Sequence, residues 1–72
     1  MFNAYLIERK LYIMSNIPKD PVILLSFVNT QLRDHFNSFE AFCNAYMADA
    51  VKIRETLHSI DYTYDLTQNQ FI

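Results

Sequence analysis

The sequence predicts a small, mostly α domain: three helices, the second and third forming a helix-turn-helix-like pair, and a short C-terminal β-hairpin. Three observations support this fold class. Apolar residues recur at helical spacing in three segments, and a residue that favours a helix N-cap precedes each segment. Near the C-terminus, aromatic and polar residues alternate, which is typical of a strand. With 72 residues, 51% of them hydrophobic, the chain can form one domain with one small core. That size leaves little room for an enclosed active site.

The first helix is predicted at residues 21–34. Asp20 favours the N-cap because its carboxylate accepts free backbone N–H groups of the first turn, and Pro21 suits the first helical position. Leu25 begins an apolar stripe at helical spacing, which continues with Val28, Leu32 and Phe36 and is widened by Leu24 and Phe27.

The second helix is predicted at residues 39–47, where either Asn37 or Ser38 suits the N-cap. Its apolar positions are i, i+3, i+4 and i+7, occupied by Phe39, Phe42, Cys43 and Tyr46. Together they predict one buried face.

The third helix is predicted at residues 50–59, with Asp49 as its N-cap. Its expected apolar face consists of Val51, Ile53, Leu57 and Ile60. Only two or three residues connect it to the second helix, and so short a connection predicts the steep crossing of a helix-turn-helix.

The hairpin is predicted because the spacing of apolar residues changes after residue 60 from helical to alternating. A four-residue loop at 66–69 places Tyr64 opposite Phe71, and Asn69 suits a left-handed position in that loop. Because an isolated two-stranded hairpin is unstable, we expect it to lie on the helices. The side chains expected to face inward are Tyr62, Tyr64 and Phe71.

The organisation predicted for the chain is an N-terminal extension or lead-in at 1–16 and a single domain at 17–72. For residues 1–13 two interpretations remain open: a segment outside the folded unit, or an extra strand. Charged residues at 8–10 interrupt the apolar run, which argues against a secretory signal, and no stretch is long enough to span a membrane.

Composition excludes several classes of function. The sequence contains no Gly, which excludes phosphate-binding loops that need a backbone without Cβ. The net charge of −2 does not favour a dedicated nucleic-acid binder. The single Cys43 cannot form an internal disulfide, so we expect a cytoplasmic protein.

No group of residues predicts catalysis, a cofactor or a metal. Cys43 with His35 or His58 as its base is the one nucleophile to consider, but Cys43 lies on an apolar stripe and is expected in the core. These three residues lack the spacing of metal ligands. We therefore expect no enzyme, no catalytic residue and no metal or cofactor site.

Two polar residues of the first helix are expected to have structural roles. Asn29 borders the apolar stripe, and its amide is expected to satisfy a backbone group of the hairpin; contact with a partner is the alternative. Arg33 is expected either to cap the helix or to pair with Asp65.

The leading functional hypothesis is a small cytoplasmic module that binds an unknown protein partner or a second copy of itself. Its predicted anchors are aromatic residues of the hairpin, provided that a strand edge is open: Tyr62, Tyr64 and Phe71. The alternative is a helix-turn-helix regulator that binds DNA or RNA through the third helix. Its predicted contacts are Lys52, Arg54, His58 and Ser59. Neither hypothesis involves a membrane.

From residue 17 onward the chain resembles a bacterial family known as domain of unknown function 4250. The blocks that carry the resemblance are Ile17–Pro21, Leu24–Asn29, Leu32–Asp34, Ser38, Cys43, Tyr62, Tyr64-Asp65 and Asn69–Phe71. Asp61 departs from the family pattern, which has Gly there, at a position after the third helix that favours left-handed backbone. The resemblance implies an intracellular bacterial protein and carries no assigned activity, substrate or catalytic residue.

Overall fold

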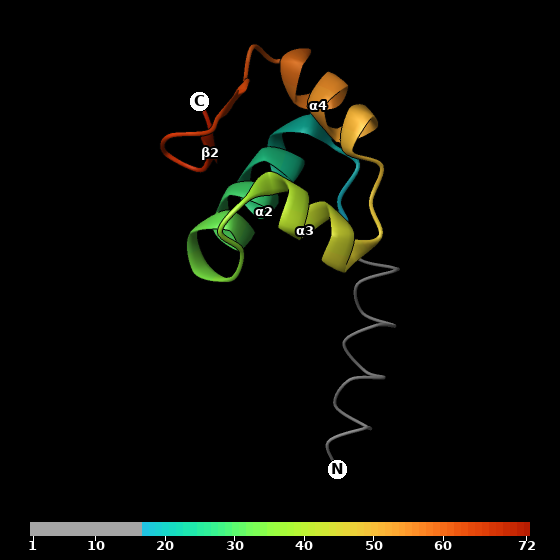
Figure 1. Cartoon of the computed structure of the whole chain (residues 1–72). Helices are drawn as coiled ribbons and strands as arrows, with labels where there is room; N and C mark the ends of the chain where they lie inside the picture. The colour runs from blue at the N-terminus through green and yellow to red at the C-terminus, as the bar shows by residue number, and fades with distance from the viewer. Residues whose placement is uncertain (1–16) are drawn as a thin grey trace.

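The computed structural model describes residues 17–72 and contains, within them, three helices and a two-stranded antiparallel sheet (Figure 1). Helix α2 spans Pro21–Asp34, as predicted. The other elements are α3 (Phe39–Tyr46), α4 (Ala50–His58), β1 (Tyr64–Asp65) and β2 (Gln70–Phe71). The predicted small, mostly α fold with a C-terminal hairpin is therefore confirmed.

Each helix begins at a side-chain cap. The Asp20 carboxylate accepts the Ile23 backbone N–H at 3.0 Å, and Asp49 accepts that of Lys52 at 3.1 Å. At α3 the cap is Ser38 and not Asn37, since the Ser38 hydroxyl accepts the Ala41 N–H at 3.0 Å. These bonds satisfy N–H groups that a helix cannot pair internally.

Two of the helices are followed by a non-glycine residue with left-handed backbone. Met47 has φ 53°, so α3 ends at Tyr46, one residue earlier than predicted, and the Ala48 N–H bonds the Cys43 carbonyl at 2.9 Å. After α4, which ends at His58, Asp61 has φ 69°. The left-handed position expected at Asp61 is thus present, and Asp occupies it at a cost that Gly would avoid.

The hairpin has the predicted register. Tyr64 pairs with Phe71 and Asp65 with Gln70, while Asn69 has φ 54° in the turn between the strands. Beyond the two assigned strands, Thr63 and Ile72 exchange two backbone hydrogen bonds of 2.9 Å. Strand β2 packs beside α2, so the hairpin lies against the helices.

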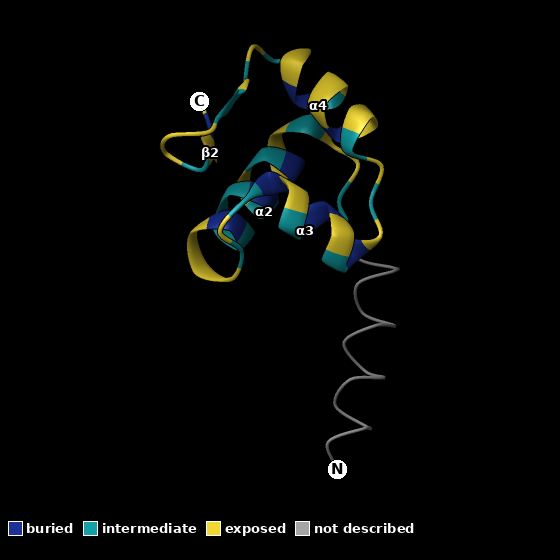
Figure 2. Cartoon of the chain, viewed as in Figure 1, coloured by how far each residue is buried: buried dark blue, intermediate teal, exposed yellow. Residues whose placement is uncertain are grey.

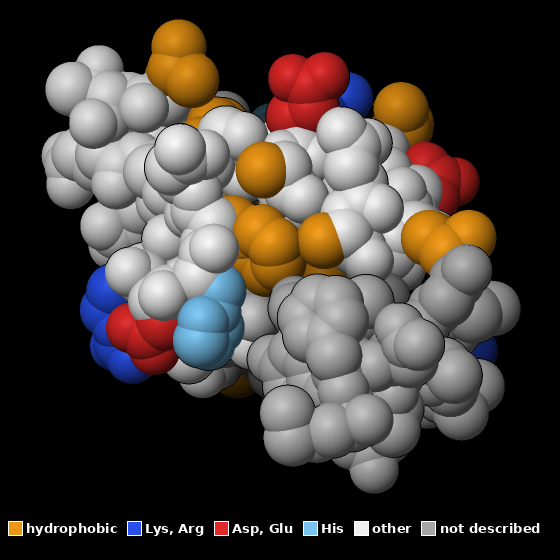
Figure 3. Space-filling model, turned by 60° about the horizontal axis from the view of Figure 1, so that its bottom comes forward, with side chains coloured by type: hydrophobic (Ala, Val, Ile, Leu, Met, Phe, Trp, Pro, Cys, Tyr) orange, Lys and Arg blue, Asp and Glu red, His pale blue; other side chains and the backbone are white. Residues whose placement is uncertain are grey.

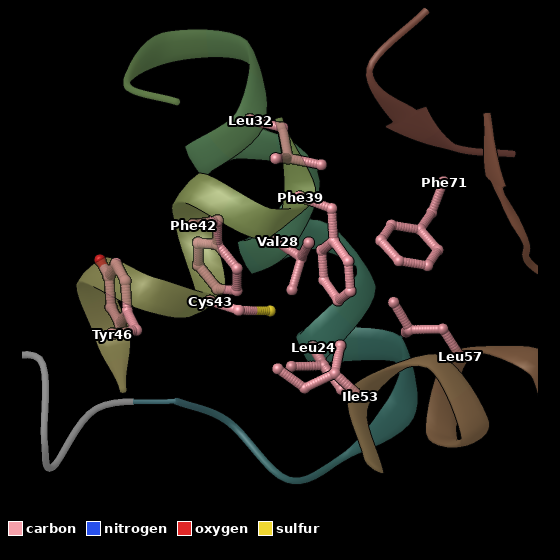
Figure 4. Packing of buried hydrophobic residues seen from close by; sticks show 10 residues of the cluster. All are labelled: Leu24, Val28, Leu32, Phe39, Phe42, Cys43, Tyr46, Ile53, Leu57 and Phe71. Atoms are coloured by element: carbon pink, nitrogen blue, oxygen red, sulfur yellow. The ribbon is translucent and has the colours of Figure 1, made fainter. Parts of the chain in front are cut away.

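The core lies between the three helices and β2 (Figures 2 and 4). Its buried residues are Leu24, Val28, Leu32, Phe39, Phe42, Cys43, Tyr46, Ile53, Leu57 and Phe71. Two predicted positions are corrected. The buried stripe of α2 consists of Leu24, Val28 and Leu32, whereas Leu25 is only partly buried. Val51 is 55% exposed because it lies two residues, about 200° of helical rotation, before the buried Ile53.

The predictions for residues 1–16 lie outside the part of the chain that the structure describes. Among the helices at 17–72, none combines the length and the apolar character needed to cross a bilayer.

Candidate protein-interaction site

The thiol of Cys43 is a core group. Cys43 is buried, and its sulfur is directed into the apolar cluster (Figure 4). Burial raises the pKa of the thiol, an effect that nearby Arg54 partly opposes and Asp49 reinforces. Within residues 17–72, no three His, Cys, Asp or Glu side chains gather where they could hold a metal ion. The prediction that Cys43 packs in the core is confirmed.

Asn29 pairs with the hairpin as another strand would. Its Nδ2 donates to the Phe71 carbonyl at 3.0 Å, and its Oδ1 accepts the Phe71 N–H at 2.9 Å. Both groups lie on the outer edge of β2, away from β1, so the side chain of Asn29 closes that edge. The predicted structural hydrogen bond is confirmed, and it is a double one.

A second polar connection joins the turn of the hairpin to α2 and α3. The Tyr64 hydroxyl donates to Asn69 Oδ1 at 2.6 Å and accepts the Phe39 N–H at 3.3 Å. The Asn69 amide donates to the carbonyls of Leu32 and Phe36 at 3.2 and 2.9 Å. The side chains of Tyr64 and Asn69 therefore satisfy the start of one helix and the end of another.

The charged pair at the end of α2 differs from the prediction. Arg33 donates two hydrogen bonds to neighbouring Asp34, from Nε to Oδ1 at 2.8 Å and from Nη2 to Oδ2 at 3.0 Å. It does not pair with Asp65. The Asp65 carboxylate instead accepts the Thr67 N–H. The hydrogen bond from Arg33 lowers the pKa of Asp34, but both side chains are well exposed, so water screens the pair.

The outer edge of β1 is open. In an antiparallel ladder, residues beside a doubly bonded pair point their N–H and C=O groups away from the partner strand. Thr63 and Ile72 form such a pair, so the N–H and C=O of Tyr64 point outward. Within residues 17–72, neither backbone group of Tyr64 has a hydrogen-bond partner. The two edges of the hairpin thus differ: Asn29 closes one, and no residue of 17–72 pairs with the other.

Beside the open edge lies a hollow of about 320 Å³ between α4 and the hairpin. It is lined by Arg54, Glu55, His58, Tyr62, Thr63, Tyr64 and Phe71. The Arg54 guanidinium carbon lies 5.8 Å above the centre of the Phe39 ring, and that contact holds the cation beside the hollow. This hollow, with the free edge of β1, is the candidate site.

The structure brings together residues that the sequence assigned to two different hypotheses. Tyr62 and Tyr64 are half-buried and line the hollow with Arg54 and His58 of α4. Phe71 forms part of its floor but is only 1% exposed, so it is a core residue rather than an anchor that a partner can grip.

Two of the predicted nucleic-acid contacts lie elsewhere. Lys52 lines a larger hollow of about 750 Å³ between the residues before α2 and the α3–α4 connection. Ser59 is exposed, and its hydroxyl donates to the Thr56 carbonyl at 2.6 Å.

Sequence reasoning missed the contact of Arg54 with Phe39 and the side-chain bonds of Asn69. The i, i+4 rule finds pairs on one helix, whereas Arg54 and Phe39 belong to different helices and Asn69 lies 37 residues from Leu32. For Asn69 the sequence indicated only a left-handed position in the turn, and not the hydrogen bonds of its side chain.

The described residues define a small helical domain whose C-terminal hairpin is fastened to the helices by polar side chains. The chain belongs to the family described as domain of unknown function (DUF4250), whose model matches residues 18–71. Comparison with curated proteins and with solved structures found no match.

Proposed function

We propose that this protein is a non-catalytic binding module that accepts an extended segment of another protein as an additional strand beside β1. The observation that carries this proposal is the pair of outward, unpartnered backbone groups on Tyr64. Strand addition uses such groups for affinity and a neighbouring pocket for side-chain selection. The hollow beside β1 supplies that pocket.

The surroundings of the open edge support docking. Tyr62 and Tyr64 offer aromatic surface, which is enriched at protein interfaces. The position of Tyr64 is fixed because its hydroxyl is hydrogen-bonded to α3 and to Asn69 and its ring lies 5.6 Å from that of Phe39. A partner strand would therefore meet a preformed edge, which lowers the entropic cost of binding. A free buried thiol at Cys43 is in keeping with a cytoplasmic location.

The test selects short random peptides displayed on phage against the full chain, and then compares the native chain with one N-methylated at the Tyr64 amide. Chemical synthesis with ligation at Cys43 gives access to this variant. N-methylation removes the outward N–H and leaves the side chain and the bonds to β2 in place. We expect selected peptides to bind the native chain and to lose at least about tenfold in affinity with the variant.

N-methylation at Gln68, an exposed residue of the turn, is the matched control and should leave peptide affinity unchanged. The Thr63–Ile72 contacts, observed by NMR, verify that both variants keep the hairpin. Failure to select any peptide, or equal binding by the Tyr64 variant, would overturn the proposal. Concentration-dependent dimers that the Tyr64 variant cannot form would instead identify the added strand as β1 of a second copy.

The alternative function is binding of DNA or RNA through α4 in a helix-turn-helix arrangement. It is supported by the solvent exposure of Lys52, Arg54, His58 and Ser59 and by the three-residue connection before α4. Much of α4 is accordingly exposed in Figure 2. Against it, the acidic residues Asp49 and Glu55 are exposed on and beside the same helix. The lower side of the molecule, which Figure 3 turns toward the viewer, likewise carries separate acidic and basic groups.

Lys52 separates the two functions because it does not line the hollow beside β1. Lys52→Glu should abolish nucleic-acid binding and leave peptide binding unchanged. A fluorescence titration with random-sequence duplex DNA and single-stranded RNA at low salt measures the first effect. Tight, salt-sensitive binding lost in Lys52→Glu would favour the alternative.

A further inference from the structure

The hollow beside β1 is lined by a cation, Arg54, that has no anionic partner among residues 17–72. In the described part of the chain the only ion pair is Arg33–Asp34, so Arg54 has no carboxylate within bonding distance. Phe39 orients the Arg54 guanidinium from below, at 5.8 Å from its ring centre. His58 lies one helical turn further along the same face of α4 and also lines the hollow. Glu55 is the one acidic residue of the lining, about 100° around the helix from Arg54.

The geometry of strand addition directs one partner side chain toward this cation. In a strand paired with β1, the residue opposite Tyr64 points its side chain to the same face of the sheet as Tyr64. The Tyr64 ring lies on the helix side of the hairpin, 5.6 Å from the Phe39 ring. Because Arg54 sits over that same ring, the partner residue opposite Tyr64 faces the guanidinium.

We infer that the strand this site accepts carries Asp or Glu at the residue paired with Tyr64, whose carboxylate bonds Arg54. This inference rests on the proposed function and adds the chemistry of the partner. A carboxylate fits because Arg donates two parallel hydrogen bonds to it, and because the cation is already oriented by the aromatic ring. A neutral or basic residue there would leave the Arg54 charge unpaired beside the docked chain.

The experiment uses the peptides selected on the full chain. We expect an acidic residue to recur at one fixed position among them. Replacing it by the matching amide, Glu by Gln or Asp by Asn, should weaken binding to the native chain about tenfold, the loss typical of one charge-assisted hydrogen-bond pair. The same replacement should have little effect with the Arg54→Gln variant, since the interacting cation is gone. Lys52→Gln on the same helix is the matched control and should keep the full preference.

The outcomes separate this inference from the proposed function. Peptides that bind through the Tyr64 amide but tolerate the acid-to-amide change would overturn the acidic preference alone. A preference that survives in Arg54→Gln would assign it to a residue other than Arg54 and equally overturn the inference. Failure to obtain peptides sensitive to N-methylation of Tyr64 would remove both. The peptide substitution itself does not alter the protein, so loss of folding in Arg54→Gln does not obscure the result.

Discussion

The two edges of the C-terminal hairpin share one register but have opposite environments. On β2, the N–H and C=O of Phe71 are both bound by the Asn29 side chain. On β1, the same two groups of Tyr64 point outward without a partner in the described residues. One helix side chain thus replaces a third strand on one side, and the other side keeps the pairing capacity that edge strands present.

This difference separates the roles of neighbouring residues. Phe71 and Asn29 join the hairpin to the core, and their contribution is to stability. The backbone of Tyr64 is available to a partner, although the Tyr64 hydroxyl also bonds the helices. We expect damage to the closed edge to destabilise the domain and damage to the backbone of the open edge to affect binding alone.

The largest effect is expected from Phe71→Ala, which removes the side chain that packs the hairpin against Phe39 and Leu57 (Figure 4). Loss of a buried Phe costs about 3–5 kcal/mol, comparable with the roughly 3–5 kcal/mol that a core of this size supplies. We expect the variant to be largely unfolded at 25 °C, as measured by circular dichroism. A cooperative transition like that of the native chain would contradict the central role of Phe71.

A smaller loss is expected from Asn29→Ala, which opens the closed edge without removing apolar packing. The N–H and C=O of Phe71 lose their partners, and each such group costs about 1–3 kcal/mol when it is shielded from water. Because both bonds are only partly buried, water can replace Asn29 in part, and we expect a decrease of about 2–4 kcal/mol in the free energy of unfolding, measured by urea denaturation.

Asn44→Ala is the control for this substitution, since Asn44 is an exposed residue of α3 and Ala is the better helix former. It should be neutral or slightly stabilising. Similar stability for Asn29→Ala and Asn44→Ala would show that the bonds from Asn29 to Phe71 contribute nothing.

Amide hydrogen exchange tests the difference between the two hairpin edges in the unmodified chain, so no substitution changes the stability of the domain. The Phe71 N–H should exchange slowly because Asn29 holds it, and the Tyr64 N–H should exchange much faster. NMR resolves both amides, with the doubly bonded Thr63 and Ile72 as internal references. Equal protection at Tyr64 and Phe71 would contradict an open edge on β1.

Much of the fold was predictable because its signals are local. The caps at Asp20 and Asp49 follow from residue type next to an apolar stripe, and the register of Tyr64 with Phe71 follows from loop length. The errors are local as well. Met47 ends α3 early although nothing in its chemistry favours left-handed backbone, and Val51 was assigned to the wrong face of a short helix.

The candidate site was predictable only in part. Its aromatic residues and its α4 residues were identified separately, as anchors for different partners. These residues line one hollow because the hairpin lies beside α4. Residue spacing within one element does not predict how two elements pack. The prediction that Asn29 satisfies the hairpin succeeded because a polar group at the border of the core favours a hydrogen-bond partner, although that rule did not name Phe71.

The sequence by itself determined three capped helices, a hairpin of defined register and one small apolar core. These features arise from interactions between residues a few positions apart, or from the total amount of apolar surface. The tertiary structure alone decided which edge of the hairpin is closed and which cation stands beside the open one. Those choices depend on contacts between distant segments, such as Asn29 with Phe71 and Arg54 with Phe39, whose geometry exists only once the core has formed.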